Sequence, residues 1–205
     1  MTQSALLVID VQNDFCPGGA LAVTEGDQVI QPINSMIDRF QNIILTQDWH
    51  PENHISFANQ HAGASPFETI SLDYGEQTLW PPHCVAASNG ANFHPSLNVN
   101  AAQMTVRKGF RANIDSYSAF FENDQSTPTG LHGYLQDRSI KKLVLCGLAT
   151  DYCVAWSALD AAKLGYETSV VLPACRAIDL ADSLNKQLDN MRDAGIVIEG
   201  SLIDG

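Results

Sequence analysis

Cys153 has the position in this sequence that best suits a nucleophile. It ends the stretch 147–153 (GLATDYC), which directly follows the apolar run 143–146. This pattern predicts a buried strand, a tight turn and a helix that begins just before the thiol. A helix N-terminus lowers the pKa of a nearby thiol and presents unpaired backbone N–H groups. The segment therefore predicts a thiol with a lowered pKa, and an oxyanion site at the backbone N–H groups of Ala149 and Cys153.

Asp10 and Lys108 could supply the acid–base chemistry that such a thiol needs. Asp10 follows the apolar run 5–9, and Lys108 follows the run 104–106. Taken singly, Asp10 suits a turn cap, Lys108 a solvated surface charge, and Cys153 a small buried hydrophobe. Taken together, the carboxylate can accept the thiol proton and the ammonium can stabilise the thiolate. We therefore predict that these three side chains act as one catalytic set.

Asp48, His50 and His83 form a second group, with the donor atoms of a metal site. The first two make an Asp-x-His pair, which on an extended segment directs both side chains to the same side. A carboxylate with two imidazoles fits one divalent transition-metal ion (Zn²⁺, Fe²⁺ or Mn²⁺), with water in the remaining positions. An isolated Asp-x-His pair is equally typical of a polar surface. His54 and His61 lie nearby in the sequence, and we expect neither to be a ligand.

Four aromatic residues lie close in sequence to these polar positions: Phe15, Trp80, Tyr117 and Tyr152. Each of them, taken alone, is typical of a core or rim position. As a group beside a nucleophile, they predict a slot for a flat ring.

Strand-like and helix-like apolar patterns alternate along the chain. Short apolar runs predict strands at 5–9, 42–46, 104–106, 142–146, 167–172 and 196–199. Helical spacing of apolar residues predicts helices at 29–40, 130–137, 151–164 and 180–195, with Pro32 tolerated only in a first turn. Strands that alternate with helices predict the α/β class, with an open, mostly parallel β-sheet and helices on both faces.

The predicted strands bring the chemically capable residues to one edge of the sheet. The residues that follow a strand are Asp10, Asp48, His50, Lys108 and Cys153. Open α/β sheets bind ligands beyond the carboxyl ends of their strands. The stretch at about 48–100 has little periodicity, and such a long irregular stretch is usually functional. We predict a single domain over residues 1–205, with an irregular metal-binding insertion at about 48–100.

Composition limits the setting and the partners of the chain. Its 205 residues are 45% hydrophobic, which suits one full core, and the net charge of −12 argues against nucleic acid or an anionic membrane as a partner. The five cysteines are odd in number and widely spaced, which argues against a disulfide framework. The sequence shows no signal-peptide pattern and no apolar stretch long enough to span a bilayer. We expect a cytoplasmic protein, and a homo-oligomer is compatible with this sequence.

Several motifs together are similar to the nicotinamidase branch of the isochorismatase-like cysteine hydrolases. The matching segments are 8–15 (VIDVQNDF), 47–51 (QDWHP), 80–85 (WPPHCV), 107–109 (RKG), 115–121 (DSYSAFF), 147–154 (GLATDYCV) and 164–166 (LGY). They occur in the order and rough spacing of that branch, and they extend the resemblance over nearly the whole chain.

This resemblance implies an isochorismatase-like hydrolase fold and a set of site residues. The implied catalytic triad is Asp10, Lys108 and Cys153. The implied ligands of one divalent transition-metal ion are Asp48, His50 and His83. The implied oxyanion hole is formed by the N–H groups of Ala149 and Cys153, with a cis peptide just before Ala149. The implied ring pocket consists of Phe15, Trp80, Tyr117 and Tyr152. Some members have a further histidine ligand, but the segment 55–57 after His54 resembles the three-ligand type.

The activity implied by the resemblance is hydrolysis of nicotinamide to nicotinate and ammonia, through a thioester on Cys153, in the salvage of NAD. Pyrazinamide-like analogues would also be substrates. Two other functions remain open on the residues alone. A related amidase could act on a carbamoyl or ureido compound, although a metal that anchors a ring nitrogen has no obvious use there. A non-catalytic metal- or metabolite-binding module is disfavoured by the intact set of Asp10, Lys108 and Cys153.

Overall fold

A six-stranded sheet forms the centre of the computed structural model, which describes residues 3–203. The predicted domain of residues 1–205 extends beyond this range at both ends. The strands are β1 (Gln3–Ile9), β2 (Ile43–Asp48), β5 (Met104–Lys108), β6 (Ile140–Leu148), β7 (Glu167–Arg176) and β8 (Val197–Glu199). Their order in the sheet is β5-β2-β1-β6-β7-β8, and each neighbouring pair is parallel. The predicted α/β class with an open parallel sheet is confirmed.

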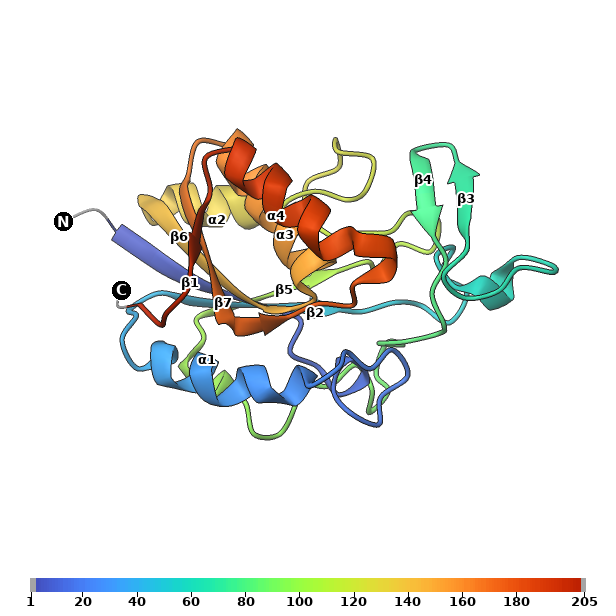
Figure 1. Ribbon diagram of the computed structural model, residues 1–205, viewed down its shortest axis with the longest axis horizontal. Coiled ribbons are helices and arrows are strands. Elements are labelled where there is room, and N and C mark those ends of the chain that lie inside the picture. Colours follow the sequence, from blue (N-terminus) through green and yellow to red (C-terminus); the bar gives the residue numbers. More distant parts are fainter. Residues whose placement is uncertain (1–2, 204–205) are drawn as a thin grey trace.

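Helices cover both faces of this sheet, as predicted (Figure 1). The helices are α1 (Ile30–Ile37), α2 (Leu131–Asp137), α3 (Ala155–Lys163) and α4 (Ser183–Asp193). Helix α1 lies on one face, and α2, α3 and α4 lie on the other (Figure 1). Pro32 lies in the first turn of α1, where its missing N–H costs no hydrogen bond. Among the described residues, no helix has both the length and the apolar character needed to cross a lipid bilayer.

The strand order reverses between β1 and β6, and this reversal determines where a site can form. The chain first adds β2 and β5 on one side of β1, and then β6, β7 and β8 on the other side. At such a switch point the two connecting segments leave in opposite directions and open a crevice at the carboxyl ends of the strands. Ile9 at the end of β1 pairs with Gly147 near the end of β6. Asp10 and the Cys153 turn therefore begin side by side.

Two helix starts differ from the predicted boundaries. The predicted helix 151–164 begins with a π-helical turn at Thr150–Val154, so Cys153 lies within that turn, and α3 starts only at Ala155. The predicted helix 180–195 starts regularly at Ser183, because Asp179, Ala181 and Asp182 have left-handed backbone angles. Non-glycine residues in that conformation interrupt a right-handed helix.

The irregular stretch at 48–100 contains an element that the sequence pattern did not predict. Strands β3 (Thr69–Leu72) and β4 (Gly75–Thr78) form an antiparallel hairpin. The hairpin lies at the carboxyl end of the main sheet, apart from the helical layers (Figure 1). Its strands are short and largely polar, so they lack the apolar alternation by which longer strands are predicted.

Candidate active site

The turn that carries Cys153 depends on a glycine at the end of β6. A Cβ atom at Gly147, whose φ is +116°, would lie 2.1 Å from the carbonyl oxygen of Ile9. No other residue type could bring β6 this close to β1 at this point. The Leu148–Ala149 peptide that follows is cis, as the family resemblance implied. The Ala149 carbonyl then accepts hydrogen bonds from the N–H groups of Tyr152 (3.2 Å) and Val154 (3.1 Å).

Lys108 connects the candidate catalytic residues to the candidate metal ligands. Its side chain, at the end of β5, is fully buried. The ammonium Nζ lies 2.8 Å from Asp10 Oδ2, 3.0 Å from the Ser116 carbonyl and 3.4 Å from Cys153 Sγ, and it also donates to Asp48 Oδ1. Burial lowers the pKa of a lysine, but the carboxylates of Asp10 and Asp48 outweigh it and raise the pKa well above its usual value. Lys108 is therefore a fixed positive charge beside the thiol.

Asp10 has the environment of a general base. It follows β1 with a left-handed φ of 47° and is fully buried. The Thr46 hydroxyl donates to Asp10 Oδ1 at 2.6 Å, and the Asp10 N–H donates to the same hydroxyl oxygen at 3.1 Å. Burial raises the pKa of Asp10 to about 6, although Lys108 opposes this effect. A carboxylate with a pKa near neutrality can both accept and return a proton.

The pKa of the Cys153 thiol differs from the sequence-based prediction. Cys153 is 6% exposed, and burial raises its pKa well above the usual value. Lys108 opposes this effect, whereas the negative charges of Asp10 and Asp48 add to it. The predicted lowering by a helix N-terminus is therefore wrong, because desolvation is the larger effect here. The resting group is a thiol, and its proton must move to a base during attack.

The structure brings that base within reach of the thiol. Oxygen and sulfur atoms of Asp10, Asp48 and Cys153 all lie within 4.8 Å of one another. The predicted set of Asp10, Lys108 and Cys153 is thus assembled at the ends of β1 and β5 and in the turn that follows β6.

Asp48, His50 and His83 also come together, with the spacing of a metal site. Their ligand atoms lie within 4.8 Å of one another, and all three side chains are buried. The Nε2 atoms of His50 and His83 lie 3.7 Å and 4.0 Å from Asp48 Oδ2. Burial alone would raise the pKa of Asp48, but Lys108 and His50 lower it well below its usual range. An ionised carboxylate and two facing imidazole nitrogens fit a divalent transition-metal ion.

Backbone carbonyls orient both imidazoles toward this position. His50 Nδ1 lies 2.8 Å from the Gly109 carbonyl, and His83 Nδ1 lies 2.9 Å from the Pro81 carbonyl. A ring that donates from Nδ1 keeps the lone pair of Nε2 for a metal. Burial, reinforced by His50, lowers the pKa of His83 to about 4. His83 is therefore neutral at physiological pH, which is the form that binds metal.

His54 and His61, which we expect not to be ligands, both have protein partners, although donor atoms of His54, His50 and Asp115 also lie within 4.8 Å of one another. His54 Nδ1 lies 2.7 Å from the Ser56 hydroxyl, and His54 Nε2 lies 3.1 Å from the Ile114 carbonyl. His61 Nε2 lies 2.7 Å from the Ile55 carbonyl. Both ring nitrogens of His54 are thus occupied, and its ring packs on His50 at a centroid distance of 4.2 Å.

Gly109, whose carbonyl orients the His50 ring, provides a test of the groups that hold the metal-type ligands in place. A Cβ atom at Gly109 would lie 2.4 Å from His50 Cε1 and 2.6 Å from His50 Nδ1. We expect Gly109→Ala to displace the His50 ring and to weaken metal binding by about 10- to 100-fold, measured by titration of the apoprotein with Zn²⁺.

Gly63→Ala is the matched control for this substitution. Gly63 also has a positive φ, of +80°, but a Cβ atom there would meet nothing within 4 Å. Both variants therefore carry the strain of a left-handed alanine, about 1–3 kcal/mol, and only one of them touches a ligand. Equal metal affinity in the two variants would contradict the proposed role of Gly109.

A pocket beside Cys153 contains all four predicted aromatic residues. The Tyr152 ring meets the Trp80 and Tyr117 rings edge-on at centroid distances of 4.9 Å and 5.5 Å. Phe15 packs on His83 at 5.5 Å. Ala149 and the metal-site residues also line this pocket, and so do three residues that sequence reasoning missed, namely Leu21, Asp115 and Ile178. The result is an aromatic slot between the thiol and the candidate metal ligands.

The β3–β4 hairpin supports this slot through a further residue that the sequence did not reveal. Gln77 is fully buried, and its Nε2 donates to Tyr117 Oη at 2.9 Å and to Asp115 Oδ2 at 2.8 Å. Trp80 Nε1 also donates to Tyr117 Oη, at 3.2 Å. These bonds fix the polar ends of two wall residues. The only available signal was a lone glutamine in the QTLW segment before Trp80, too weak to support a prediction.

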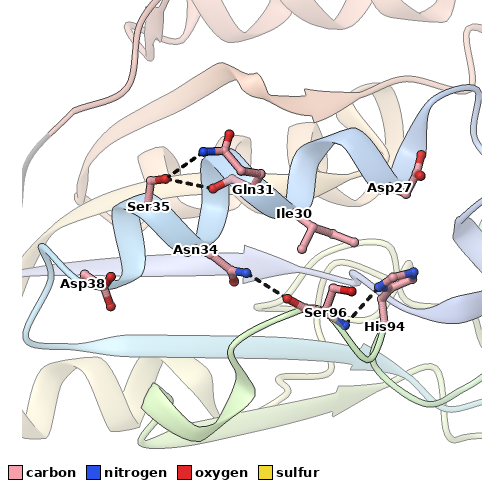
Figure 2. Close-up of a pocket in the computed structure, with 8 residues that line it drawn as sticks. All are labelled: Asp27, Ile30, Gln31, Asn34, Ser35, Asp38, His94 and Ser96. Carbon is pink, nitrogen blue, oxygen red and sulfur yellow. Dashed lines mark hydrogen bonds between the residues drawn. The ribbon is translucent and has the colours of Figure 1, made fainter.

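A second groove lies away from this site, along α1 (Figure 2). Most of its lining residues are polar, and Asn34 Nδ2 donates to the Ser96 carbonyl at 2.8 Å. Helix α1 lies on the face of the sheet opposite to α3 and α4 (Figure 1). The groove along it shares no lining residue with the Cys153 pocket.

The fold and the site together define a doubly wound α/β protein with a buried cysteine–lysine–aspartate set beside three metal-type ligands. The sequence matches the isochorismatase domain over residues 4–201. It is 53% identical to the nicotinamidase of Acinetobacter baylyi over 192 residues, which cover 94% of this chain and 90% of the relative. The chain therefore belongs to the isochorismatase-domain family.

Solved structures agree with this assignment. A nicotinamidase/pyrazinamidase from Acinetobacter baumanii superposes with a TM-score of 0.96 at 54% identity, over 97% of this chain and 96% of that chain. A pyrazinamidase of Pyrococcus horikoshii, solved in complex with zinc, superposes with a TM-score of 0.77 at 36% identity, over 96% of this chain and 98% of that chain.

Proposed function

We propose that this chain is a nicotinamidase, which hydrolyses nicotinamide to nicotinate and ammonia and so serves the salvage of NAD. One observation carries the proposal. The Asp10 carboxylate and the buried Lys108 ammonium lie beside the Cys153 thiol, and this thiol lines an aromatic slot that also contains three metal-type ligands. The high identity to a nicotinamidase over nearly the whole chain supports the same substrate.

The first half of the reaction would form a thioester. Asp10 accepts the proton of Cys153, and the sulfur attacks the amide carbon of the substrate. Lys108 stabilises the negative charge on the sulfur and orients Asp10. The oxyanion that forms would be held by the backbone N–H groups of Ala149 and Cys153. The C–N bond then breaks, and ammonia leaves with the proton that Asp10 returns.

The second half would release the acid. Asp10 takes a proton from a water molecule, and the resulting hydroxide attacks the thioester carbon. The C–S bond breaks, nicotinate leaves, and the proton returns to the sulfur of Cys153. One carboxylate thus serves twice, which suits its pKa near 6.

Asp48, His50 and His83 would hold one divalent transition-metal ion during these steps. A zinc ion in the related pyrazinamidase supports this proposal, as does the orientation of both Nε2 atoms in this chain. The ion would bind the ring nitrogen of the substrate and keep the carboxamide in line with the thiol. The aromatic residues Phe15, Trp80, Tyr117 and Tyr152 would enclose the ring, so that pyrazinamide-like rings also fit.

The rate of this reaction is expected to fall as the pH drops through about 6, because Asp10 must be ionised to accept the thiol proton. The Thr46 hydroxyl stabilises the ionised form, so its loss in Thr46→Val should raise the pKa of Asp10. The acid limb of the kcat/KM profile should then move to higher pH. Thr168→Val is the control, because Thr168 is a buried threonine whose hydroxyl bonds to the Tyr166 carbonyl instead. An acid limb at the same pH in all three proteins would exclude Asp10 as the titrating base.

A panel of amides tests the proposed function directly. Ammonia release should be fast with nicotinamide and pyrazinamide, and very slow with benzamide, which lacks a ring nitrogen, and with carbamoyl or ureido compounds. Equal rates for benzamide and nicotinamide would remove the argument for a ring-nitrogen anchor. Turnover of only the aliphatic compounds would assign the chain to a different amidase.

A further inference from the structure

Residues 177–183, here called the strap, connect β7 to α4 and form part of the wall of the candidate active site. Ile178 of the strap lines the same pocket as Cys153. The sequence predicted only a helix from residue 180 in this segment, and neither the triad nor the metal ligands include it.

One buried carboxylate accepts three hydrogen bonds from the strap. Asp151 lies in the π-helical turn that carries Cys153 and is 1% exposed. Its Oδ1 accepts from the Ile178 N–H at 3.0 Å, its Oδ2 accepts from the Asp179 N–H at 2.8 Å, and Oδ2 also accepts from the Ser183 hydroxyl. All three donors belong to the strap. The catalytic turn and the strap are therefore joined through Asp151, and Ser183 also contacts the Tyr152 side chain of the same turn.

The backbone of the strap adopts a conformation that needs such support. Asp179, Ala181 and Asp182 have φ values of 55°, 51° and 65°. Non-glycine residues seldom adopt these angles, and they keep them only where surrounding contacts impose them. Loss of the bonds to Asp151 would therefore allow the strap to relax into other conformations.

An outer pocket of about 510 Å³ lies on the other side of this wall. The hairpin strands, the turn that carries Cys153 and α4 all contribute to it, and it shares Tyr117 and Tyr152 with the catalytic pocket. Asp151 and Ser183 line the outer pocket, whereas Ile178 lines the inner one. Tyr117 and Tyr152 thus separate the two pockets, and the bonds of Asp151 connect the outer-pocket residues Asp151 and Ser183 to the strap that carries Ile178.

We propose that the strap is a gate: release of its bonds to Asp151 opens a passage from the outer pocket to Cys153, through which a small uncharged aromatic amide reaches the thiol. The identity of that substrate rests on the proposed function, but the gate does not. Asp151 is then a positioning residue, which holds Ile178 over the pocket when the gate is closed.

Alkylation of Cys153 by iodoacetamide, followed by peptide mass spectrometry, tests the gate without any need for hydrolysis. Ser183→Ala removes one of the three bonds to Asp151 and the contact of Ser183 with the Tyr152 side chain, and it leaves Asp10, Lys108 and Cys153 in place. Because a hydrogen bond of this kind stabilises the closed state by a modest amount, we expect alkylation to become about three- to tenfold faster. Gln187→Trp, which fills the outer pocket from α4, should slow both alkylation and kcat/KM for nicotinamide.

Gln31→Trp is the matched control, since Gln31 is a helix glutamine that lines the separate groove on α1 (Figure 2). It should change neither rate. Unchanged alkylation in both Ser183→Ala and Gln187→Trp would overturn the gate, and so would equal slowing by the two tryptophans. If the wild-type protein does not hydrolyse nicotinamide, the proposed function fails, while the alkylation rates still decide for or against the gate.

Discussion

Ammonia release from nicotinamide is expected to fall by at least about three orders of magnitude when Cys153 is replaced by alanine. The reason lies in the arrangement around the sulfur. Lys108 lies 3.4 Å from Sγ and 2.8 Å from Asp10, so the base and the cation are both placed to serve this one atom. Without the sulfur, neither has a nucleophile to activate, and groups that act as a unit lose most of their effect together. Steady-state ammonia release measures the change.

Cys146→Ala is the control for this substitution. Cys146 is also a buried, unpaired cysteine, and it lies on β6 just before the turn that carries Cys153, but it does not line the pocket. We expect it to cost stability and to leave kcat nearly unchanged. Substantial turnover by Cys153→Ala, or an equal loss in both variants, would contradict the assignment of Cys153 as the nucleophile.

Removal of both imidazole ligands is expected to abolish metal binding and, with it, most of the activity. In the double variant His50→Ala, His83→Ala, Asp48 alone would remain, and one carboxylate does not retain a transition-metal ion against solvent. Metal analysis of the purified protein should find about one divalent ion per wild-type chain and none in the variant. Activity should fall by at least about two orders of magnitude, since substrate orientation is lost.

His61→Ala serves as the control for this double variant. The ring of His61 bonds to the Ile55 carbonyl and is not among the clustered ligands. Metal content and activity should both be close to wild type. An unchanged metal content in the double variant would show that the ion binds elsewhere, and unchanged activity without metal would show that the substrate ring needs no such anchor.

The placement of the site could be predicted from the sequence because it follows from the strands. Asp10, Asp48, Lys108 and Cys153 each come at or just after a strand end, and the parallel strands bring their carboxyl ends to one edge of the sheet. The type of fold was predictable for a similar reason, since buried parallel strands are short, continuous apolar runs such as 5–9.

The rest of the pocket could not be predicted, because it is made of residues without a pattern. Gln77 belongs to a hairpin of short polar strands. Ile178 belongs to an irregular segment that bonds to the carboxylate of Asp151, a residue far from it in the sequence. The pKa of Cys153 was predicted in the wrong direction for a related reason. Proximity to a turn can be seen in the sequence, whereas the degree of desolvation depends on how completely the folded chain encloses the sulfur.

Hydroxylamine trapping of the acyl group on Cys153 is the most direct test of the central claim. Hydroxylamine competes with water for a thioester, so a reaction through Cys153 must yield nicotinohydroxamate at the expense of nicotinate, in a ratio that rises with the hydroxylamine concentration. We predict this product from the wild-type protein and its absence from Cys153→Ala. Ammonia release with nicotinate as the sole product at every hydroxylamine concentration would contradict a covalent route through this cysteine.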